Sequence, residues 1–333
     1  MTTRGRYAAY ADRIASVSPT YAAWARSLDD HLVALLDEVP ETKRQPELLF
    51  AVARRLGADP SDPGALRALG REARPTLVAA LGSATVQAND PRRLGPVVPL
   101  FAALAARTRR PLGLVDAGAA AGLCSIPDRV TLDHCTGARP QLVRMHTAVE
   151  DPSVHLVVDA SGVLPAPATG PIRVAARVAL DPNPIDLAEP GAFDRLVEAV
   201  PPEATDRTAL MRAAARATLA APPVRITGTL PGDLDRALDT LPDGCEPVVL
   251  TTGTLVYVPG AERQRFVDRV RERGVHWIAL ERTGILTGVA ASLPPDVDPD
   301  APDAFATASL DGVAAAVSDP FGVRVRWLRD PNL

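Results

Sequence analysis

The sequence has few cysteines, no long basic block and no long apolar segment, and each absence excludes a class of protein. Its three cysteines lack metal-ligand spacing and are odd in number, which argues against a disulfide framework and favours a reducing compartment. A formal net charge of −4 disfavours nucleic acid or an anionic membrane as a partner. Residues 1–17 contain no apolar core of the kind found in secretory signals or membrane spans. We therefore expect a cytoplasmic protein without a metal site.

What the sequence does contain is enough apolar surface for a sizeable core, since 47% of its 333 residues are hydrophobic. The length exceeds the range of about 250 to 300 residues at which single cores stop growing, so one enlarged α/β domain or two domains are expected. We predict a helical cap over residues 1–108 and an α/β domain over residues 109–333, with an insertion at about 131–172.

The cap is predicted from helical start signals and periodic apolar residues. Ser18 followed by Pro19 is typical of a helix start, and Pro46 begins a second helix. The first helical stretch has one apolar face, formed by Tyr21, Trp24, Leu28, Leu32, Leu35, Leu36 and Val39. A polar cluster, residues 87–90, precedes the next helix, and the ordinary interpretation is that Asn89 or Asp90 caps it.

The stretch most informative about function is residues 111–129, PLGLVDAGAAAGLCSIPDR. A short apolar strand ends at Asp116, and a turn of glycine and alanine, residues 118–122, is predicted to lead into a helix. A turn with so little side-chain bulk lets the backbone approach a ligand closely, and such turns bind nucleotide-like ligands in open α/β sheets. In dinucleotide enzymes an acid follows the glycines by roughly 20 residues, whereas here an acid precedes them.

Further strands are predicted at residues 174–180, 224–227, 247–258 and 275–281, separated by helices, with an antiparallel pair within residues 305–328. Strands that alternate with helices imply parallel crossover units and a doubly wound, mostly parallel sheet. Residues 132–172 are expected to be irregular, with one strand at residues 154–158.

Asp181 ends the second of these predicted core strands. An acid there accepts hydrogen bonds from ribose hydroxyls in doubly wound sheets, while the structural alternative is an aspartate that opens a proline turn. We expect the carboxylates of Asp116 and Asp181 to face a shared crevice wide enough for an adenosyl group.

The pattern around Asp116 resembles the first motif of class I S-adenosylmethionine-dependent methyltransferases, with Ala120 where glycine is more usual. The resemblance implies that Asp116 orients the methionine end of the cofactor and that the turn lies against its ribose. It also implies a class I methyltransferase-like Rossmann fold. Thr229 stands where many of these enzymes carry an acid for the adenine amino group.

Four motifs together resemble one bacterial family, domain of unknown function 2332, which is considered methyltransferase-like. They are residues 87–90, residues 118–123, Asp128-Arg129 and residues 181–186, and the resemblance covers nearly the whole chain. The sequence departs from the family at Cys124, at Val130 and at residues 318–322, which replace an asparagine, a tyrosine and a histidine-rich segment. If those histidines line the pocket, general-base chemistry is altered or absent.

These observations predict an S-adenosylmethionine-dependent methyltransferase acting on a small molecule, with a homodimer left open. Two alternatives stay open: an inactive methyltransferase fold that serves as a binding or assembly module, and an NAD(P)-dependent oxidoreductase. The candidate catalytic residues, each of which taken singly is more often structural, are Gln87, Asn89, Tyr257 and Glu281. The candidate cofactor-binding residues are Asp116, Gly118, Ala120, Gly122, Leu123, Asp181, Asn183 and Thr252.

Overall fold

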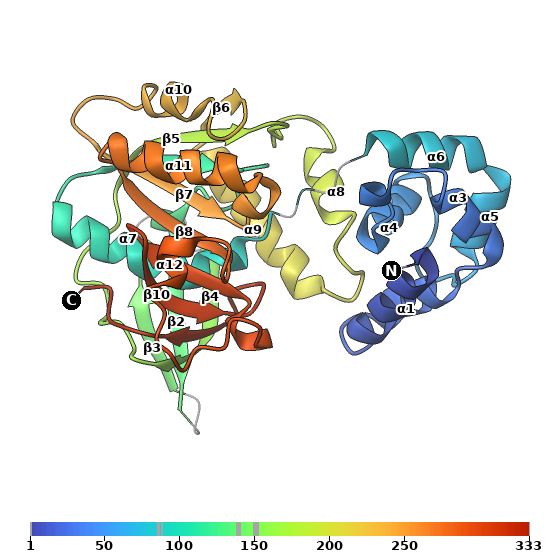
Figure 1. The fold of residues 1–333 in the computed structure, drawn as a ribbon, viewed down its shortest axis with the longest axis horizontal. Coiled ribbons are helices and arrows are strands. Elements are labelled where there is room, and N and C mark those ends of the chain that lie inside the picture. Colours follow the sequence, from blue (N-terminus) through green and yellow to red (C-terminus); the bar gives the residue numbers. More distant parts are fainter. Residues whose placement is uncertain (1, 85–86, 88, 138–140, 149–152, 333) are drawn as a thin grey trace. The chain divides into compact units, whose positions relative to one another are not determined.

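The computed structural model describes residues 2–84, 87, 89–137, 141–148 and 153–332, and the chain forms two compact units (Figure 1). The helical unit comprises Met1–Ala88 and Ala188–Ala209, and the sheet unit comprises Asn89–Leu187 and Leu210–Leu333. The predicted end of the cap, residue 108, lies within the sheet unit of this division. The predicted domain boundaries stay predictions. Among the described residues, no helix is both long enough and apolar enough to cross a membrane.

The helical unit is built around buried aromatic rings. Its helices are α1 (Thr3–Ile14), α2 (Pro19–Arg26), α3 (Asp30–Leu36), α4 (Pro46–Arg55), α5 (Ala65–Glu72), α6 (Arg74–Ser83) and α8 (Ala192–Val197). The Ser18 side chain caps α2, as predicted. The Phe50 ring packs against Tyr21 and Trp24 with centroid separations of 4.9 and 5.4 Å. All seven residues of the apolar face predicted for residues 21–39 are buried. They do not lie on one helix, however, because the Asp29 side chain caps a second helix, α3, and divides the stretch in two.

One arginine ties residues 188–209 to this unit. Arg54 donates from Nη1 to the carbonyl oxygens of Glu198 and Val200, each at 2.7 Å. The Ser18 hydroxyl donates to the Glu203 carboxylate at 2.6 Å, and the same carboxylate accepts from the Thr20 N–H. Arginine forms such forked contacts with several oxygens through its fixed planar head group. The segment therefore belongs structurally to the helical unit, although it lies far along the sequence.

The sheet unit contains one sheet, whose described strands lie in the order β3-β2-β4-β11-β10-β9-β8-β7-β1-β5-β6. The strands from β8 to β6 run parallel, as do β2, β4 and β11, while β9, β10 and the edge strand β3 add antiparallel pairs. The bounds are β1 (Leu112–Ala117), β2 (Val130–Thr136), β3 (Gln141–His146), β4 (Val154–Gly162), β5 (Val174–Asp181), β6 (Val224–Thr227), β7 (Glu246–Thr252), β8 (His276–Arg282), β9 (Ala306–Leu310), β10 (Val313–Ser318) and β11 (Arg324–Trp327).

Helices cover both faces of this sheet (Figure 1). On one face, α10 (Leu234–Leu238), α11 (Gly260–Glu272) and α12 (Thr287–Ala290) bury a core that includes Val115 of β1 and Phe266 against Trp277. On the other, α7 (Leu94–Thr108) packs against β2, β4, β8 and β9, and α9 (Thr205–Ala220) precedes β6. The mostly parallel α/β sheet expected from the strand and helix pattern is thus present.

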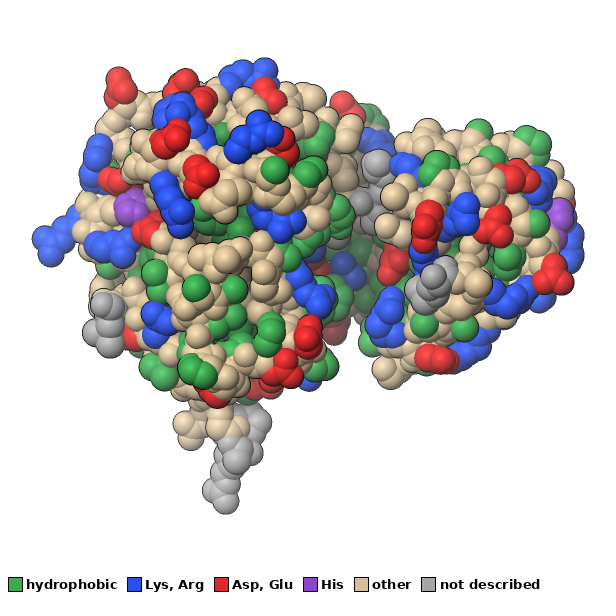
Figure 2. All heavy atoms as spheres, viewed as in Figure 1, with side chains coloured by type: hydrophobic (Ala, Val, Ile, Leu, Met, Phe, Trp, Pro, Cys, Tyr) green, Lys and Arg blue, Asp and Glu red, His purple; other side chains and the backbone are tan. Residues whose placement is uncertain are grey.

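Charged side chains on the visible face of the sheet unit alternate in sign (Figure 2). Arg269 of α11 and Arg273, which follows that helix, both contact the carboxylate of Asp235 on α10 at 2.9 Å. Arg273 also pairs with Asp239 at 2.7 Å. These exposed pairs connect two neighbouring helices, where each contributes little stability because solvent screens it.

Two structural predictions are wrong. The turn after β1 does not lead into a helix; residues 123–126 continue to a single 3₁₀ turn, Pro127–Arg129, and then to β2. The stretch 132–172 is also not irregular, because β2, β3 and β4 lie there and extend the sheet beyond β11. The inward residues of β2 are Val130, Leu132 and His134, and the histidine in this apolar row concealed the period-2 pattern of a strand.

His134 gives the sheet unit a pH dependence that can be measured. Its ring is fully buried beside Trp327, both ring nitrogens lack partners among the described residues, and burial lowers its pKa from the usual 6.5 to about 4. Between these values the unfolded chain binds the proton and the folded one does not, so stability falls as pH falls. Relative to wild type, His134→Leu should gain about 3 kcal/mol on acidification from pH 6.5 towards pH 4.

The measurement is denaturant unfolding of both proteins across this pH range. Buried carboxylates elsewhere affect both proteins equally, so the difference between the two stability curves isolates His134. A difference that stays constant between neutral and acidic pH would contradict the burial of a neutral ring at this position.

Candidate functional site

The turn that follows β1 depends on glycine for a specific contact. Gly118, Ala120 and Gly122 all adopt positive φ, of 82°, 49° and 76°. A Cβ atom on Gly118 would lie 2.1 Å from the Thr254 hydroxyl oxygen, and that hydroxyl donates to the Ala117 carbonyl at 2.9 Å. The glycine thus allows the tip of β7 to approach the end of β1 directly, which closes the turn on one side.

Most N–H groups of this turn already have acceptors within the protein. Gly118 donates to the Leu180 carbonyl at 2.7 Å, and Ala120 donates to the Asp181 carboxylate at 2.9 Å. Leu123 donates to the side-chain oxygen of Asn89 at 2.8 Å. Of the predicted cofactor contacts, Ala120 and Asn183 both donate directly to Asp181. Leu123 is hydrogen-bonded instead to Asn89, a predicted catalytic residue.

Asp116 lies beside the turn at the end of β1 and is 1% exposed. Its Oδ2 accepts from the Ser125 hydroxyl at 2.7 Å, while its Oδ1 has no partner among the described residues. Burial raises the pKa of Asp116 to about 7, the Ser125 hydrogen bond opposes this, and the nearby Asp181 charge adds to it. A buried carboxyl with one unsatisfied oxygen and a pKa near neutrality is a feature common at functional sites.

Asp181 has the partners expected of a turn-opening aspartate. Its two carboxylate oxygens accept from the N–H groups of Asn183 and Ala120, at 2.8 and 2.9 Å, and the residue is 6% exposed. The two acids lie on neighbouring parallel strands, as predicted, and Asp181 is close enough to raise the pKa of Asp116. However, both acids are covered by the protein's own atoms, so the expected open crevice floor is not seen at these residues.

Arg93 links the remaining buried groups of the site. It donates from Nη1 to the Thr252 carbonyl at 2.8 Å, at the end of β7. Its positive charge opposes the burial that raises the pKa values of Asp116 and Glu281. Arg93 was not among the predicted site residues, because its position depends on a contact between residues 159 apart in sequence.

Glu281 ends the buried part of β8 and braces the neighbouring loop. It is 1% exposed, and its oxygens accept from the N–H groups of Thr254 and Leu255, each at 3.0 Å. Burial raises the pKa of Glu281 to about 7, against the effect of these two hydrogen bonds. Its geometry is that of a structural support for residues 254–257, and its catalytic role stays a prediction.

Two residues of the polar cluster before α7, Asn89 and Asp90, have different hydrogen-bond partners. Asp90 caps the 3₁₀ turn Pro91–Arg93 through the Arg92 N–H, and its carboxylate pairs with the Arg92 guanidinium at 2.6 Å. Asn89 does not cap a helix but holds the turn through Leu123. The capping interpretation is therefore confirmed for Asp90 alone.

The other candidate residues differ in accessibility. Tyr257 is 82% exposed at the end of a 3₁₀ turn, Leu255–Tyr257, and Gln87 belongs to the helical unit. Thr229, in the place of an adenine-binding acid, donates its N–H to Asp233 at 2.8 Å, so an acid four residues later folds back to this strand end. Among the described residues, no group of three or more His, Cys, Asp or Glu could hold a metal ion.

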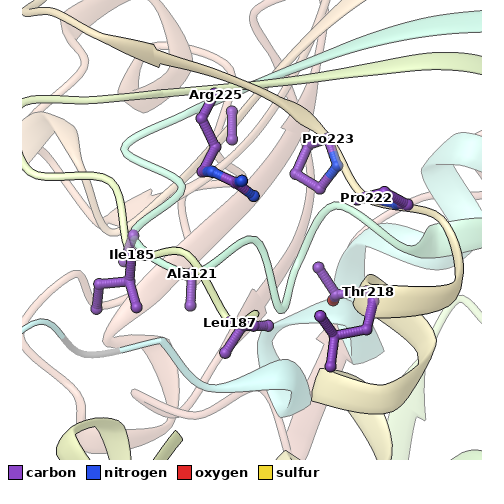
Figure 3. A pocket seen from close by; sticks show the side chains of 10 residues that line it. Ala121, Ile185, Leu187, Thr218, Pro222, Pro223 and Arg225 are labelled. Atoms are coloured by element: carbon purple, nitrogen blue, oxygen red, sulfur yellow. The ribbon is translucent and has the colours of Figure 1, made fainter. Parts of the chain in front are cut away.

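Residues behind the turn enclose a small apolar space (Figure 3). Ala120, Ile185, Leu187, Thr218 and Pro223 line it, and its internal volume is about 10 Å³, which is close to that of one water probe. At the rim, Arg225 pairs with Asp186 at 2.5 Å. The space is too small for an adenine ring in this arrangement.

Comparison with protein families gives one match, to a family described as uncharacterised proteins conserved in bacteria, domain of unknown function 2332 (DUF2332), over residues 4–327. The chain belongs to the DUF2332 family. Comparisons with curated proteins and with solved structures found no match.

The motifs of the DUF2332 resemblance meet at the turn. Asn89 holds Leu123, Asp181 holds Ala120, and the Ile185 N–H donates to the Ala120 carbonyl at 2.9 Å. The fourth motif, Asp128-Arg129, lies where the chain enters β2. Arg177 of β5 pairs with Asp128 at 2.5 Å and donates to the Ser125 carbonyl at 2.9 Å. In this DUF2332 protein, segments distant in sequence therefore converge on residues 118–129.

Proposed function

We propose that the sheet unit binds S-adenosylmethionine at the carboxyl ends of β1 and β5 and methylates a small-molecule acceptor. One observation carries the proposal: the turn after β1 lies where the strand order reverses. If the core strands β1, β5, β6, β7 and β8 are numbered 1 to 5 along the chain, their order across the sheet is 3-2-1-4-5. Strand β1 therefore has β5 on one side and β7 on the other. Ligands of doubly wound sheets bind at this reversal point, outside the carboxyl ends of the strands.

The residues at this point fit a ligand that carries hydrogen-bond donors. Asp116 offers a buried carboxylate oxygen with no partner among the described residues. Asp181 accepts two backbone N–H groups and would exchange these for ribose hydroxyls on binding. Ligand binding would then displace part of residues 182–187, because the Ile185 N–H is bonded to the Ala120 carbonyl.

S-adenosylmethionine supplies an electrophilic methyl group, so the chain needs little acid-base apparatus. What the protein must contribute is a fixed position for the acceptor and exclusion of water. We assign the acceptor side to Asn89 and Tyr257 in the sheet unit, with Glu281 holding the loop that carries Tyr257. Gln87 lies in the helical unit, and its predicted catalytic role stays a prediction.

One observation favours the second candidate, a methyltransferase-like fold used for binding or assembly. The N–H groups of Gly118, Ala119, Ala120, Gly122 and Leu123 donate to acceptors within the chain. A turn whose donors are satisfied internally provides fewer contacts for a cofactor. The third candidate, a nicotinamide enzyme, is disfavoured by the acid that precedes the glycines.

Denaturant unfolding with added ligands separates the three candidates. A ligand that binds only the native state should raise the free energy of unfolding by about 2.7 kcal/mol at a hundredfold excess over Kd. We expect this increase with S-adenosylmethionine and S-adenosylhomocysteine and none with NAD. Asp181→Asn should abolish the increase, whereas the exposed Asp298→Asn should retain it.

The opposite outcomes are equally informative. An increase with NAD alone would identify a nicotinamide-binding protein. No increase with any of the three ligands would leave the binding or assembly module as the better account.

A further inference from the structure

The chain passes from one of its two units to the other three times. The first passage is at Ala88–Asn89, the second is at Leu187–Ala188, and the third lies inside α9, between Ala209 and Leu210. A passage inside a continuous helix is a stiff connection, since each residue is fixed at a rise of about 1.5 Å. These three passages are the covalent routes by which one unit acts on the other.

A residue on or near each connection contacts the same turn. Asn89, the first residue of the sheet unit, accepts from the Leu123 N–H at 2.8 Å. Ile185, three residues before Ala188, donates its N–H to the Ala120 carbonyl. The Thr218 hydroxyl, on the same helix as the third passage, lies 3.2 Å from the Gly122 carbonyl and 2.9 Å from the Ala214 carbonyl of its own helix, so its single proton is shared between these acceptors. Residues 118–123 thus contact a residue on each of the three connections.

The far ends of these connections are held in the helical unit. Arg54 binds the carbonyl groups that follow α8, and Glu203 accepts from the Ser18 hydroxyl and the Thr20 N–H just before α9 begins. A displacement of the helical unit would therefore act on residues 182–187 and on α9. It would reach the turn through Ile185 and Thr218.

A small packing gap lies beside the residues that such a movement would shift. Ile185, Leu187 and Thr218 border the small apolar space beside Ala120 and Ala121 (Figure 3). Its volume of about 10 Å³ is close to that of one water probe, so side chains on its walls lack contacts on that side only. The Asp186–Arg225 pair lies partly exposed at the rim and is a weak restraint.

We propose that residues 118–123 couple ligand binding in the sheet unit to the orientation of the helical unit. A ligand that reorders the turn shifts the orientations that the helical unit adopts, and by linkage a restraint on the helical unit changes ligand affinity. The ligand half of this proposal rests on the proposed function, while the mechanical half concerns the three connections alone.

Distances between spin labels test the mechanical half without ligand. The labels are attached at Thr76→Cys in α6 and Ala261→Cys in α11, both exposed, with Cys135 and Cys245 replaced by serine. Asn89→Ala and Thr218→Val each remove one tie to the turn, and a thermal scan confirms that each variant folds. We expect both to broaden the distribution of inter-label distances and to shift its mean. Asn89→Asp keeps the acceptor oxygen and should restore the original distribution.

Two matched variants serve as controls. Thr240→Val removes a hydroxyl that donates to the Arg236 carbonyl in the helix just before it, α10. Asn332→Ala removes an exposed amide near the end of the described chain. Both should leave the distribution unchanged. Unchanged distributions in folded Asn89→Ala and Thr218→Val would overturn the mechanical half.

Addition of S-adenosylhomocysteine tests the ligand half on the same labelled protein. A narrower, shifted distribution is expected. Binding seen by calorimetry without any change in distance would overturn the coupling and leave the proposed function intact. Absence of binding would overturn the proposed function, and the tie variants would then decide the coupling alone.

Discussion

Gly118→Ala should lower the free energy of unfolding by about 3 kcal/mol. Gly118 has φ +82°, where a side chain costs roughly 1–2 kcal/mol. The added Cβ would overlap Thr254, whose hydroxyl oxygen lies 2.1 Å from its position, and overpacking costs a further 1–3 kcal/mol or so. Thr254 cannot turn away without breaking its bond to the Ala117 carbonyl.

Gly284 provides a matched control for this substitution. Its φ of +88° is similar, but nothing lies within 4 Å of the added Cβ. Gly284→Ala should therefore show only the conformational cost, about 1 kcal/mol. Urea unfolding of the two variants measures the difference, and equal losses would contradict the close approach of β7 to the turn.

Asp181→Ala should lower the free energy of unfolding by about 3 kcal/mol even without ligand. The substitution leaves the N–H groups of Ala120 and Asn183 without their acceptor. The Ala120 N–H is buried, and a buried unsatisfied donor costs roughly 1–3 kcal/mol, whereas water can reach the exposed Asn183. Asp181→Asn keeps one acceptor oxygen and should lose about half as much. The unfolding midpoints of the two variants test this order.

Asp298 is the matched control, because it accepts from the N–H two residues ahead in the same way but is exposed. Asp298→Ala should cost well under about 1 kcal/mol, since water replaces the lost acceptor. If Asp181→Ala were as mild as Asp298→Ala, the carboxylate would not support the turn. Because Asp181→Ala lowers stability by itself, loss of ligand binding is best measured in the less destabilised variant Asp181→Asn.

The parts of the fold that the sequence predicted are those governed by local periodicity. The apolar face from Tyr21 to Val39, the strand ending at Asp116 and the strand ending at Asp181 all have patterns set by residues close in sequence. The adjacency of the two acids followed from parallel strand order, which the spacing of strands and helices indicated.

The failures arose where tertiary contacts override local pattern. The small-residue turn is followed by Leu123 and Ile126, an apolar spacing that also suits a helix, but Pro127 and the pairing of Val130 with Val154 redirect the chain into β2. Arg93 entered the site only through its contact with Thr252, and no local signal marks it. The sequence did not show that the expected crevice is filled, because Asp181 accepts from the Ala120 N–H of the turn as well as from the Asn183 N–H nearby.

Two buried acids at the site, Asp116 and Glu281, make the free energy of unfolding depend on pH. Burial raises the pKa values of Asp116 and Glu281 to about 7, and Arg93 partly offsets both. Because the folded chain binds these protons more tightly than the unfolded chain, the two acids lower stability as pH rises from about 4 towards 7. A site that retains such groups at a cost in stability is consistent with a role other than support of the fold.

A crystal structure of the full chain with S-adenosylhomocysteine tests the central claim most directly. The account predicts the ribose hydroxyls on the Asp181 carboxylate, a ligand donor on Oδ1 of Asp116, and residues 182–187 moved away from Ala120. Electron density for the ligand elsewhere on the chain would contradict it. A site that stays empty at saturating ligand, with the turn still bonded to Asn89, Asp181 and Ile185, would also contradict it.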